Sequence, residues 1–192
     1  MPEAWSPTDD ALLFGVSRDS HVSLWALSLR DGTAAPFGGV RSSSPLASAF
    51  SPDGRWIAYG STESGGREIY VQAFPGPDVR YQVSRNGTSI HPLWSRDGTE
   101  LFFHPAPRQF CAISVTSRPN FTFGNAVAIP LPSTGLGPAS AREYDVTPDG
   151  TRFVGVVPAG QAKHAPAAPE VRVILNWFDE VKARMREVDR SR

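Results

Sequence analysis

One short pattern returns four times along the 192 residues of this chain. In each copy an apolar residue precedes Ser or Thr, then come turn-forming residues, usually with Asp-Gly, and then a second apolar run. Pro sets φ at the first corner of a turn, and Asp-Gly supplies side-chain hydrogen bonds and a positive φ. Each copy therefore predicts two strands joined by a tight turn. The copies occupy residues 5–14, 50–59, 94–103 and 146–155.

The spacing of the copies predicts a row of similar sheets. The hydroxyl residues stand at positions 6, 51, 95 and 147, which suits propeller blades of about 40–45 residues with an insertion before the last copy. Further apolar runs follow each of the first three turns. They predict third strands at 22–29, 68–74 and 110–115, and fourth strands at 34–37, 80–84 and 126–130. We predict an all-β partial β-propeller of about four antiparallel four-stranded blades with a C-terminal α-helix.

The predicted propeller segment covers residues 1–176, with blades at about 2–40, 41–88, 89–134 and 140–176. The last blade shows strands near 143–147, 152–157 and 171–176, and no fourth strand is evident. Asn176 is a suitable N-cap, and apolar residues recur behind it at helical spacing. We therefore expect an amphipathic helix at 177–190, which either packs on the propeller or docks on a partner.

Composition excludes several functions. The chain carries 19 basic and 19 acidic residues, so no global field favours nucleic acid. No segment approaches the ~18 uninterrupted apolar residues of a membrane helix, and no signal peptide is visible, so we expect a soluble chain. The one cysteine, Cys111, lies in an apolar run and predicts a buried structural thiol.

No residue set points to catalysis, a cofactor or a metal. The sequence lacks a Gly-x-Ser-x-Gly nucleophile elbow and the phosphate loop of a kinase. The histidines His21, His91, His104 and His164 are scattered, although a propeller could bring His91 near His104. The recurring acids Asp53, Asp97 and Asp149 could form a ring for a cation, but turn chemistry already explains Asp before Gly.

Aromatic residues precede three of the turns. Trp5, Phe50 and Trp94 end the strands that enter these turns. They could line the mouth of a ligand site, but we expect them to pack between neighbouring blades, where burial of each is worth ~2–3 kcal/mol.

The Ser-Pro-Asp-Gly hairpins resemble the repeats of TolB/PD40 (WD40-like) β-propellers. Three longer stretches, residues 68–77, 92–103 and 173–181, resemble the C-terminal propeller end of bacterial eukaryotic-like serine/threonine protein kinases. That resemblance implies a non-catalytic binding, sensor or scaffold module of a larger, membrane-tethered kinase-like protein, with the propeller outside the cytoplasm. The chain departs from such kinases because it contains no kinase domain.

The resemblance also implies partners. TolB-like propellers resemble the six- or seven-bladed kind, so four blades would leave apolar faces and sheet edges open. We expect the remaining blades of a longer propeller, or a second copy, to cover them, and a protein, peptide or small ligand to bind the propeller face. The alternative from another functional class is the accessory propeller of a peptidase, or a propeller-based lyase.

Overall fold

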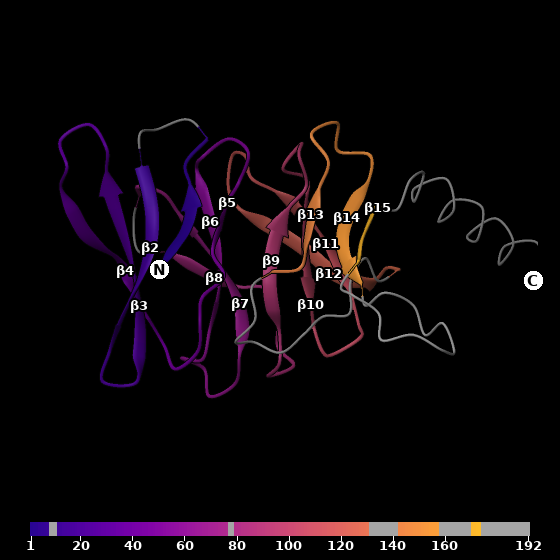
Figure 1. Cartoon of the computed structure of the whole chain (residues 1–192), viewed down its shortest axis with the longest axis horizontal. Coiled ribbons are helices and arrows are strands. Elements are labelled where there is room, and N and C mark those ends of the chain that lie inside the picture. The colour runs from indigo at the N-terminus through magenta and orange to yellow at the C-terminus, as the bar shows by residue number, and fades with distance from the viewer. Residues whose placement is uncertain (8–10, 77–78, 131–141, 158–169, 174–192) are drawn as a thin grey trace, which may run out of the picture.

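The computed structural model describes residues 1–7, 11–76, 79–130, 142–157 and 170–173, and these residues form four separate antiparallel sheets. Each sheet consists of consecutive strands, and Figure 1 shows the sheets side by side from indigo to orange. The predicted all-β propeller architecture is confirmed. The predicted helix at 177–190 lies outside the described residues.

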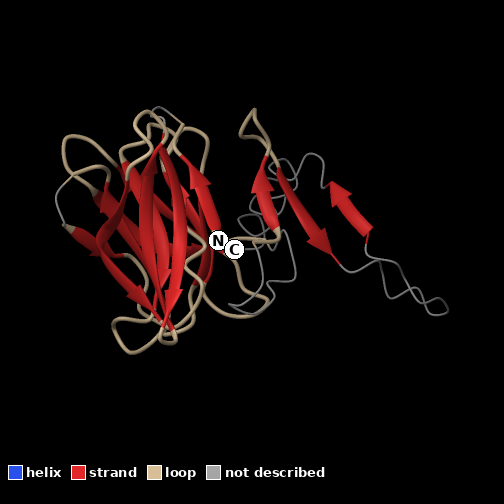
Figure 2. Cartoon of the chain, turned by 60° about the vertical axis from the view of Figure 1, so that its left-hand side comes forward, coloured by secondary structure: helices blue, strands red, loops and turns tan. Residues whose placement is uncertain are grey.

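Three of the four blades have four strands, paired in sequence order. In blade four the described residues form three strands. All regular structure in the described residues is strand, as Figure 2 shows, so they contain no helix that could span a membrane. The strands are β1 Pro2–Trp5, β2 Ala11–Arg18, β3 His21–Ser28 and β4 Ala34–Ser42; β5 Ala49–Phe50, β6 Trp56–Ser61, β7 Glu68–Ala73 and β8 Arg80–Gln82; β9 Ile90–Trp94, β10 Glu100–His104, β11 Cys111–Thr116 and β12 Thr122–Ala128; and β13 Tyr144–Val146, β14 Phe153–Val157 and β15 Glu170–Val173.

Apolar layers lie between successive blades. Alternation along each strand sends neighbouring side chains to opposite faces of its sheet, so each central blade contributes to two layers. Leu13 and Leu24 of blade one pack with Tyr59 and Tyr70 of blade two. The next layer joins Ala58, Ile69 and Val71 to Leu101, Phe103 and Ile113, and the last joins Phe102, Phe110 and Ala112 to Tyr144 and Phe153. Cys111 lies in the second layer as a buried free thiol, as predicted.

Strand β4 is longer than the sequence predicts. The sequence places a strand at 34–37, whereas β4 continues through Gly38 and Gly39 to Ser42. Both glycines adopt positive φ, 59° and 62°, which allows the strand to bulge and then rejoin β3. This bulge shapes a hollow in blade one.

Candidate binding surfaces

The recurring turns share one hydrogen-bonded geometry. The hydroxyl of Ser51 donates to Asp53 Oδ1 at 2.7 Å and accepts from the Trp56 amide at 3.0 Å. The same two bonds join Ser95 to Asp97 at 2.6 Å and to the Glu100 amide at 2.9 Å. The fourth copy repeats the arrangement with Thr147, Asp149 and Arg152. The glycine after each aspartate has φ near 70° and donates its amide to the hydroxyl residue's carbonyl.

Each of the recurring aspartates is bound within its own turn. Each carboxylate accepts hydrogen bonds from its own turn, and Arg118 Nη2 lies 3.8 Å from Asp53 Oδ2. Asp53 and Asp97 line one cavity of about 350 Å³, and this guanidinium supplies the positive charge there. Among the described residues no group of three or more His, Cys, Asp or Glu side chains is arranged to hold a metal.

The hydrogen bonds of the fourth turn lead to a testable prediction about the pKa of Asp149. Hydrogen bonds, first from the Thr147 hydroxyl and then from the Thr151 amide, lower the pKa of Asp149 from 3.8 to about 2. Because the folded-state pKa is depressed, the stabilisation is complete above pH 3.8 and is lost as the pH falls through about 2. A carbon-detected NMR titration should give a midpoint near 2. In Thr147→Val the midpoint should move back toward 3.8, and an unchanged midpoint would contradict the assigned cause.

Successive corners contact one another. A Cβ placed on Gly98 would lie 3.5 Å from Pro52 Cδ, and one on Gly150 would lie 3.3 Å from Arg96 Cβ. The Arg96 guanidinium also crosses to blade four, where Nη2 donates to the Val146 carbonyl at 2.7 Å. The turns therefore occupy equivalent corners of neighbouring sheets.

The two histidines that the fold could bring together are neighbours, and both are buried. The ring centroids of His91 and His104 are 6.4 Å apart, and each residue is 1% exposed. His104 Nδ1 lies 2.8 Å from the Gln109 carbonyl, and its ring packs against Phe110 and Tyr144. Burial lowers the pKa of His104, which favours a neutral ring inside the layer between blades three and four.

The packing prediction for the aromatic residues holds for two of the three. Trp94 is 3% exposed and its indole donates to the Ala49 carbonyl of the preceding blade at 3.2 Å. Phe50 is partly buried against the layer between blades one and two, and its ring lies edge-on to Phe74 with centroids 5.0 Å apart. For Trp5 the prediction is wrong, since this residue is 65% exposed. Within the described residues no blade precedes blade one, so Trp5 has no neighbour corresponding to the one that Trp94 uses.

Blade one presents an apolar outer face. Alternation along β2 and β3 places Leu13 and Leu24 toward blade two, so the intervening side chains point away from it. We define the outer face of blade one by four of its partly exposed apolar residues, Leu12, Phe14, Trp25 and Leu27. The Phe14 and Trp25 rings are 6.3 Å apart on this face.

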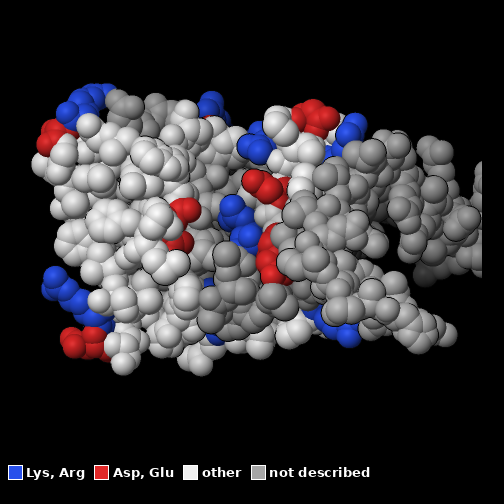
Figure 3. Space-filling view, in the orientation of Figure 1, with Lys and Arg blue, Asp and Glu red and all other residues white. Residues whose placement is uncertain are grey.

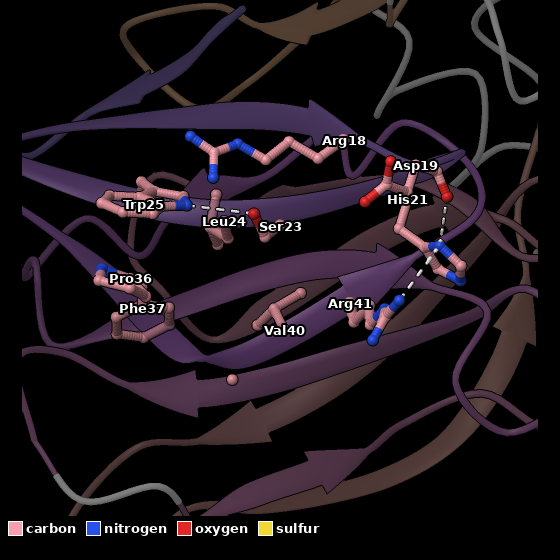
Figure 4. Close-up of a pocket in the computed structure, with 11 residues that line it drawn as sticks. Arg18, Asp19, His21, Ser23, Leu24, Trp25, Pro36, Phe37, Val40 and Arg41 are labelled. Carbon is pink, nitrogen blue, oxygen red and sulfur yellow. Dashed lines mark hydrogen bonds between the residues drawn. The ribbon is translucent and has the colours of Figure 1, made fainter.

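A hollow opens in the same sheet, where β3 and β4 separate (Figure 4). Trp25 pairs with Pro36 and Ser23 pairs with Arg41, so residues 37–40 lie opposite Leu24 alone. The cavity has about 350 Å³, and the buried Leu24, Phe37 and Val40 contribute to its lining.

Aromatic and charged groups complete the lining of this hollow. The indole of Trp25 donates to the Ser23 hydroxyl at 3.1 Å. Arg18 and Arg41 are exposed, and His21 Nδ1 lies 2.9 Å from the Asp19 carbonyl. This hollow was not predicted from the sequence, where the glycine pair before Val40 was the available signal.

Comparison with known proteins supports the same architecture. No family model matches the chain. A sequence relative, the Tol-Pal system protein TolB of Anaeromyxobacter dehalogenans strain 2CP-C, is 29% identical over 94 residues. The aligned stretch is 49% of this chain but 21% of the relative, so the chain matches about a fifth of that protein's length.

Solved structures extend the similarity over most of the chain. TolB from Acinetobacter baumannii superposes with a TM-score of 0.63 at 16% identity, over 83% of this chain and 37% of that one. The β-propeller domain of the Trilobed protease from Pyrococcus furiosus gives a TM-score of 0.50 at 12% identity, over 81% of this chain and 47% of that one. At these identities the structures share the fold alone. With its four sheets, their stacked corner turns and these similarities, the chain has a TolB-like β-propeller fold.

Proposed function

We propose that this chain is a non-catalytic binding or scaffold module. The observation that carries the proposal is the outer face of blade one, where apolar side chains and a hollow lie beside the exposed guanidiniums of Arg18 and Arg41. Trp and Arg are the residue types most enriched among the strongest contributors to protein interfaces. Contiguous exposed apolar surface of this kind commonly marks a site of association.

The charge distribution favours binding through local contacts over long-range electrostatic attraction of a charged partner. The sequence has no net charge. In the view of Figure 3, basic and acidic side chains are interspersed over the surface. Binding would therefore depend on local shape and on particular pairs, and the apolar outer face would supply most of the free energy.

The proposed context is the C-terminal part of a larger kinase-like protein. The stretches 68–77, 92–103 and 173–181 support it, because they resemble the propeller end of bacterial serine/threonine kinases. The chain also covers 37% of the Acinetobacter baumannii TolB structure, which leaves room in such a protein for further blades. Its partners would then be those blades or a second copy, together with a protein, peptide or small ligand.

A dye-binding experiment tests the proposed surface. The intact chain should enhance the fluorescence of 1-anilinonaphthalene-8-sulfonate while its far-UV circular dichroism remains that of a folded β protein. Leu12→Lys and Leu27→Lys should reduce the enhancement several-fold, since each places a charge on the outer face of blade one. Thr33→Lys, at an exposed position of the β3–β4 turn, serves as the matched control and should leave the enhancement unchanged.

A screen for enzymatic turnover tests the proposed non-catalytic role. The isolated chain should release no product from peptide or oligosaccharide libraries. Oligosaccharide cleavage would favour the lyase alternative and overturn the proposed function. Equal dye enhancement in the intact chain and in both outer-face variants would contradict the proposed binding surface.

A further inference from the structure

We propose that the hollow between β3 and β4 of blade one binds a small aromatic carboxylate, with the ring on the apolar floor and the carboxylate at the Arg41 guanidinium. The inference rests on the proposed binding function and names its ligand class. Three features of the hollow support this ligand: its shape, the pairing of the polar groups in its wall, and the charges at its mouth.

The hollow is a pit that lies within the sheet and is closed at both ends. Strands β3 and β4 come back into register at each end, at the pairs Trp25–Pro36 and Ser23–Arg41. An extended peptide laid along the hollow would meet paired strands at either end. A cavity of about 350 Å³ is instead of the size that holds a small molecule. The shape therefore favours a compact ligand.

Buried apolar side chains form the floor of the hollow. Leu24, Phe37 and Val40 line it and belong to the layer packed against blade two. The bulge of β4 also rests on blade two, since a Cβ on Gly38 would overlap the side chain of Gln72. The floor is thus fixed before a ligand arrives, which lowers the entropic cost of binding.

The aromatic wall beside this floor has its polar atoms already bonded within the protein. The Trp25 indole donates to the Ser23 hydroxyl at 3.1 Å, and that hydroxyl donates to the Val16 carbonyl at 3.3 Å. The wall therefore offers no free N–H or O–H to the body of a ligand. An aromatic ring suits such a wall, because contacts between rings contribute beyond the area that they bury. A sugar would leave most of its hydroxyls without partners there.

The charges at the mouth of the hollow favour an anion with a single charge. Arg18 and Arg41 line the hollow, are exposed, and form no ion pair with any residue that the structure describes. Asp19 is the only acid among the described lining residues. With His21 neutral, two positive charges and one negative charge leave a net charge of one positive. A carboxylate matches this charge, whereas the second negative charge of a phosphate ester has no counterpart.

Arg41 is the better placed of the two arginines to take the carboxylate. Its Nη2 lies 3.4 Å from His21 Nδ1, and Nδ1 lies 2.9 Å from the Asp19 carbonyl oxygen. A proton that Nδ1 donates to this carbonyl leaves Nδ1 no lone pair for Arg41. The guanidinium then keeps its fork of N–H groups for a carboxylate, which matches it with two parallel hydrogen bonds. Figure 4 shows Arg41 at one end of the hollow and Trp25 at the other, so charge and ring would separate along its length.

Ligand titrations of the intact chain test the proposal. The probe is 2-naphthoate, followed by the shift of the Trp25 indole N–H in nitrogen–proton correlation spectra and by Overhauser effects between ligand and protein. It should bind with a Kd below about 1 mM, and its ring should give Overhauser effects to Leu24 and Val40. The uncharged 2-naphthamide keeps the ring and should bind at least about ten-fold more weakly.

Variants of two exposed arginines test the assigned position of the carboxylate. Arg41→Gln should weaken binding of 2-naphthoate about ten-fold and leave the affinity for 2-naphthamide unchanged. Arg41→Lys keeps the charge without the fork and should restore only part of the preference for the acid. Arg30→Gln is the matched control, because Arg30 is exposed in the β3–β4 turn and does not line the hollow. It should leave both affinities unchanged.

Three results would overturn the inference. Equal affinities for 2-naphthoate and 2-naphthamide would show that the charge of the ligand is not recognised. Equal weakening by Arg41→Gln and Arg30→Gln would show attraction to surface cations in general. Tighter binding of 2-naphthyl phosphate, or of a peptide ending in phenylalanine, would assign the hollow to another class of ligand.

The dye experiment separates these failures from a failure of the proposed function. Leu12 and Leu27 do not line the hollow, so their variants test the outer face of blade one without altering it. If 2-naphthoate fails to bind while Leu12→Lys and Leu27→Lys still reduce the dye enhancement, the ligand class is wrong and the binding surface stands. If these variants also leave the enhancement unchanged, the inference and the proposed function both fail.

Discussion

Replacing Phe103 by Ala is expected to lower the free energy of unfolding by about 3–5 kcal/mol. The Phe103 ring is 1% exposed and lies in the layer between blades two and three. Its removal leaves a cavity between two sheets that are fixed by their own hydrogen bonds, so the neighbours cannot collapse into it. The loss would be a large share of the stability of an ordinary domain.

Phe14→Ala is the matched control, because Phe14 holds the equivalent position in blade one. Its ring is partly exposed, and its centroid lies 6.3 Å from that of the Trp25 ring. The expected loss in the free energy of unfolding is therefore about 1 kcal/mol. Urea unfolding followed by far-UV circular dichroism measures both variants. Equal losses would show that the two faces are equally buried, which contradicts the open outer face of blade one.

Gly38→Ala should be the second large destabilisation, at about 2–5 kcal/mol. Gly38 has a φ of 59°, where an L side chain is strained by about 1–2 kcal/mol. A Cβ at this position would also overlap the side-chain amide nitrogen of Gln72. Gln72 is fully buried and its Oε1 accepts from the Tyr59 hydroxyl at 3.2 Å, so this overpacking adds about 1–3 kcal/mol.

Gly39→Ala separates the two causes. Its φ is 62°, but a Cβ there would meet nothing within 4 Å. The expected loss is therefore the backbone strain alone, about 1–2 kcal/mol. Chemical denaturation of the two variants gives the comparison. If Gly39→Ala lowered the free energy of unfolding as much as Gly38→Ala, the contact between the β4 bulge and Gln72 would contribute nothing to stability.

The repeat was readable from the sequence because its turns are local. Ser51, Asp53 and Gly54 form their bonds within a few residues, so their chemistry determines the turn wherever it lies. The spacing of the copies then predicts the succession of sheets, since each hairpin needs a neighbour to bury its apolar side. The buried state of Cys111 followed in the same way from the apolar run around it.

Contacts between blades were harder to predict from the sequence. Trp5 and Trp94 precede equivalent turns, yet Trp5 is 65% exposed and Trp94 3% exposed. The difference depends on the presence of a preceding blade, which no local pattern encodes. The hollow in blade one was missed for a related reason. It forms because Gly38 and Gly39 bulge β4 away from Leu24, and the glycines alone indicate a break without giving its shape.

Contacts between successive corner turns test the central claim most directly, because they require the repeats to stack as blades. Nuclear Overhauser spectra of the labelled chain should show cross-peaks between Pro52 Hδ and Gly98 Hα and between Arg96 Hβ and Gly150 Hα. These contacts connect blade two to blade three and blade three to blade four. A folded chain that gave the peaks within each turn but none between turns would contradict the propeller arrangement.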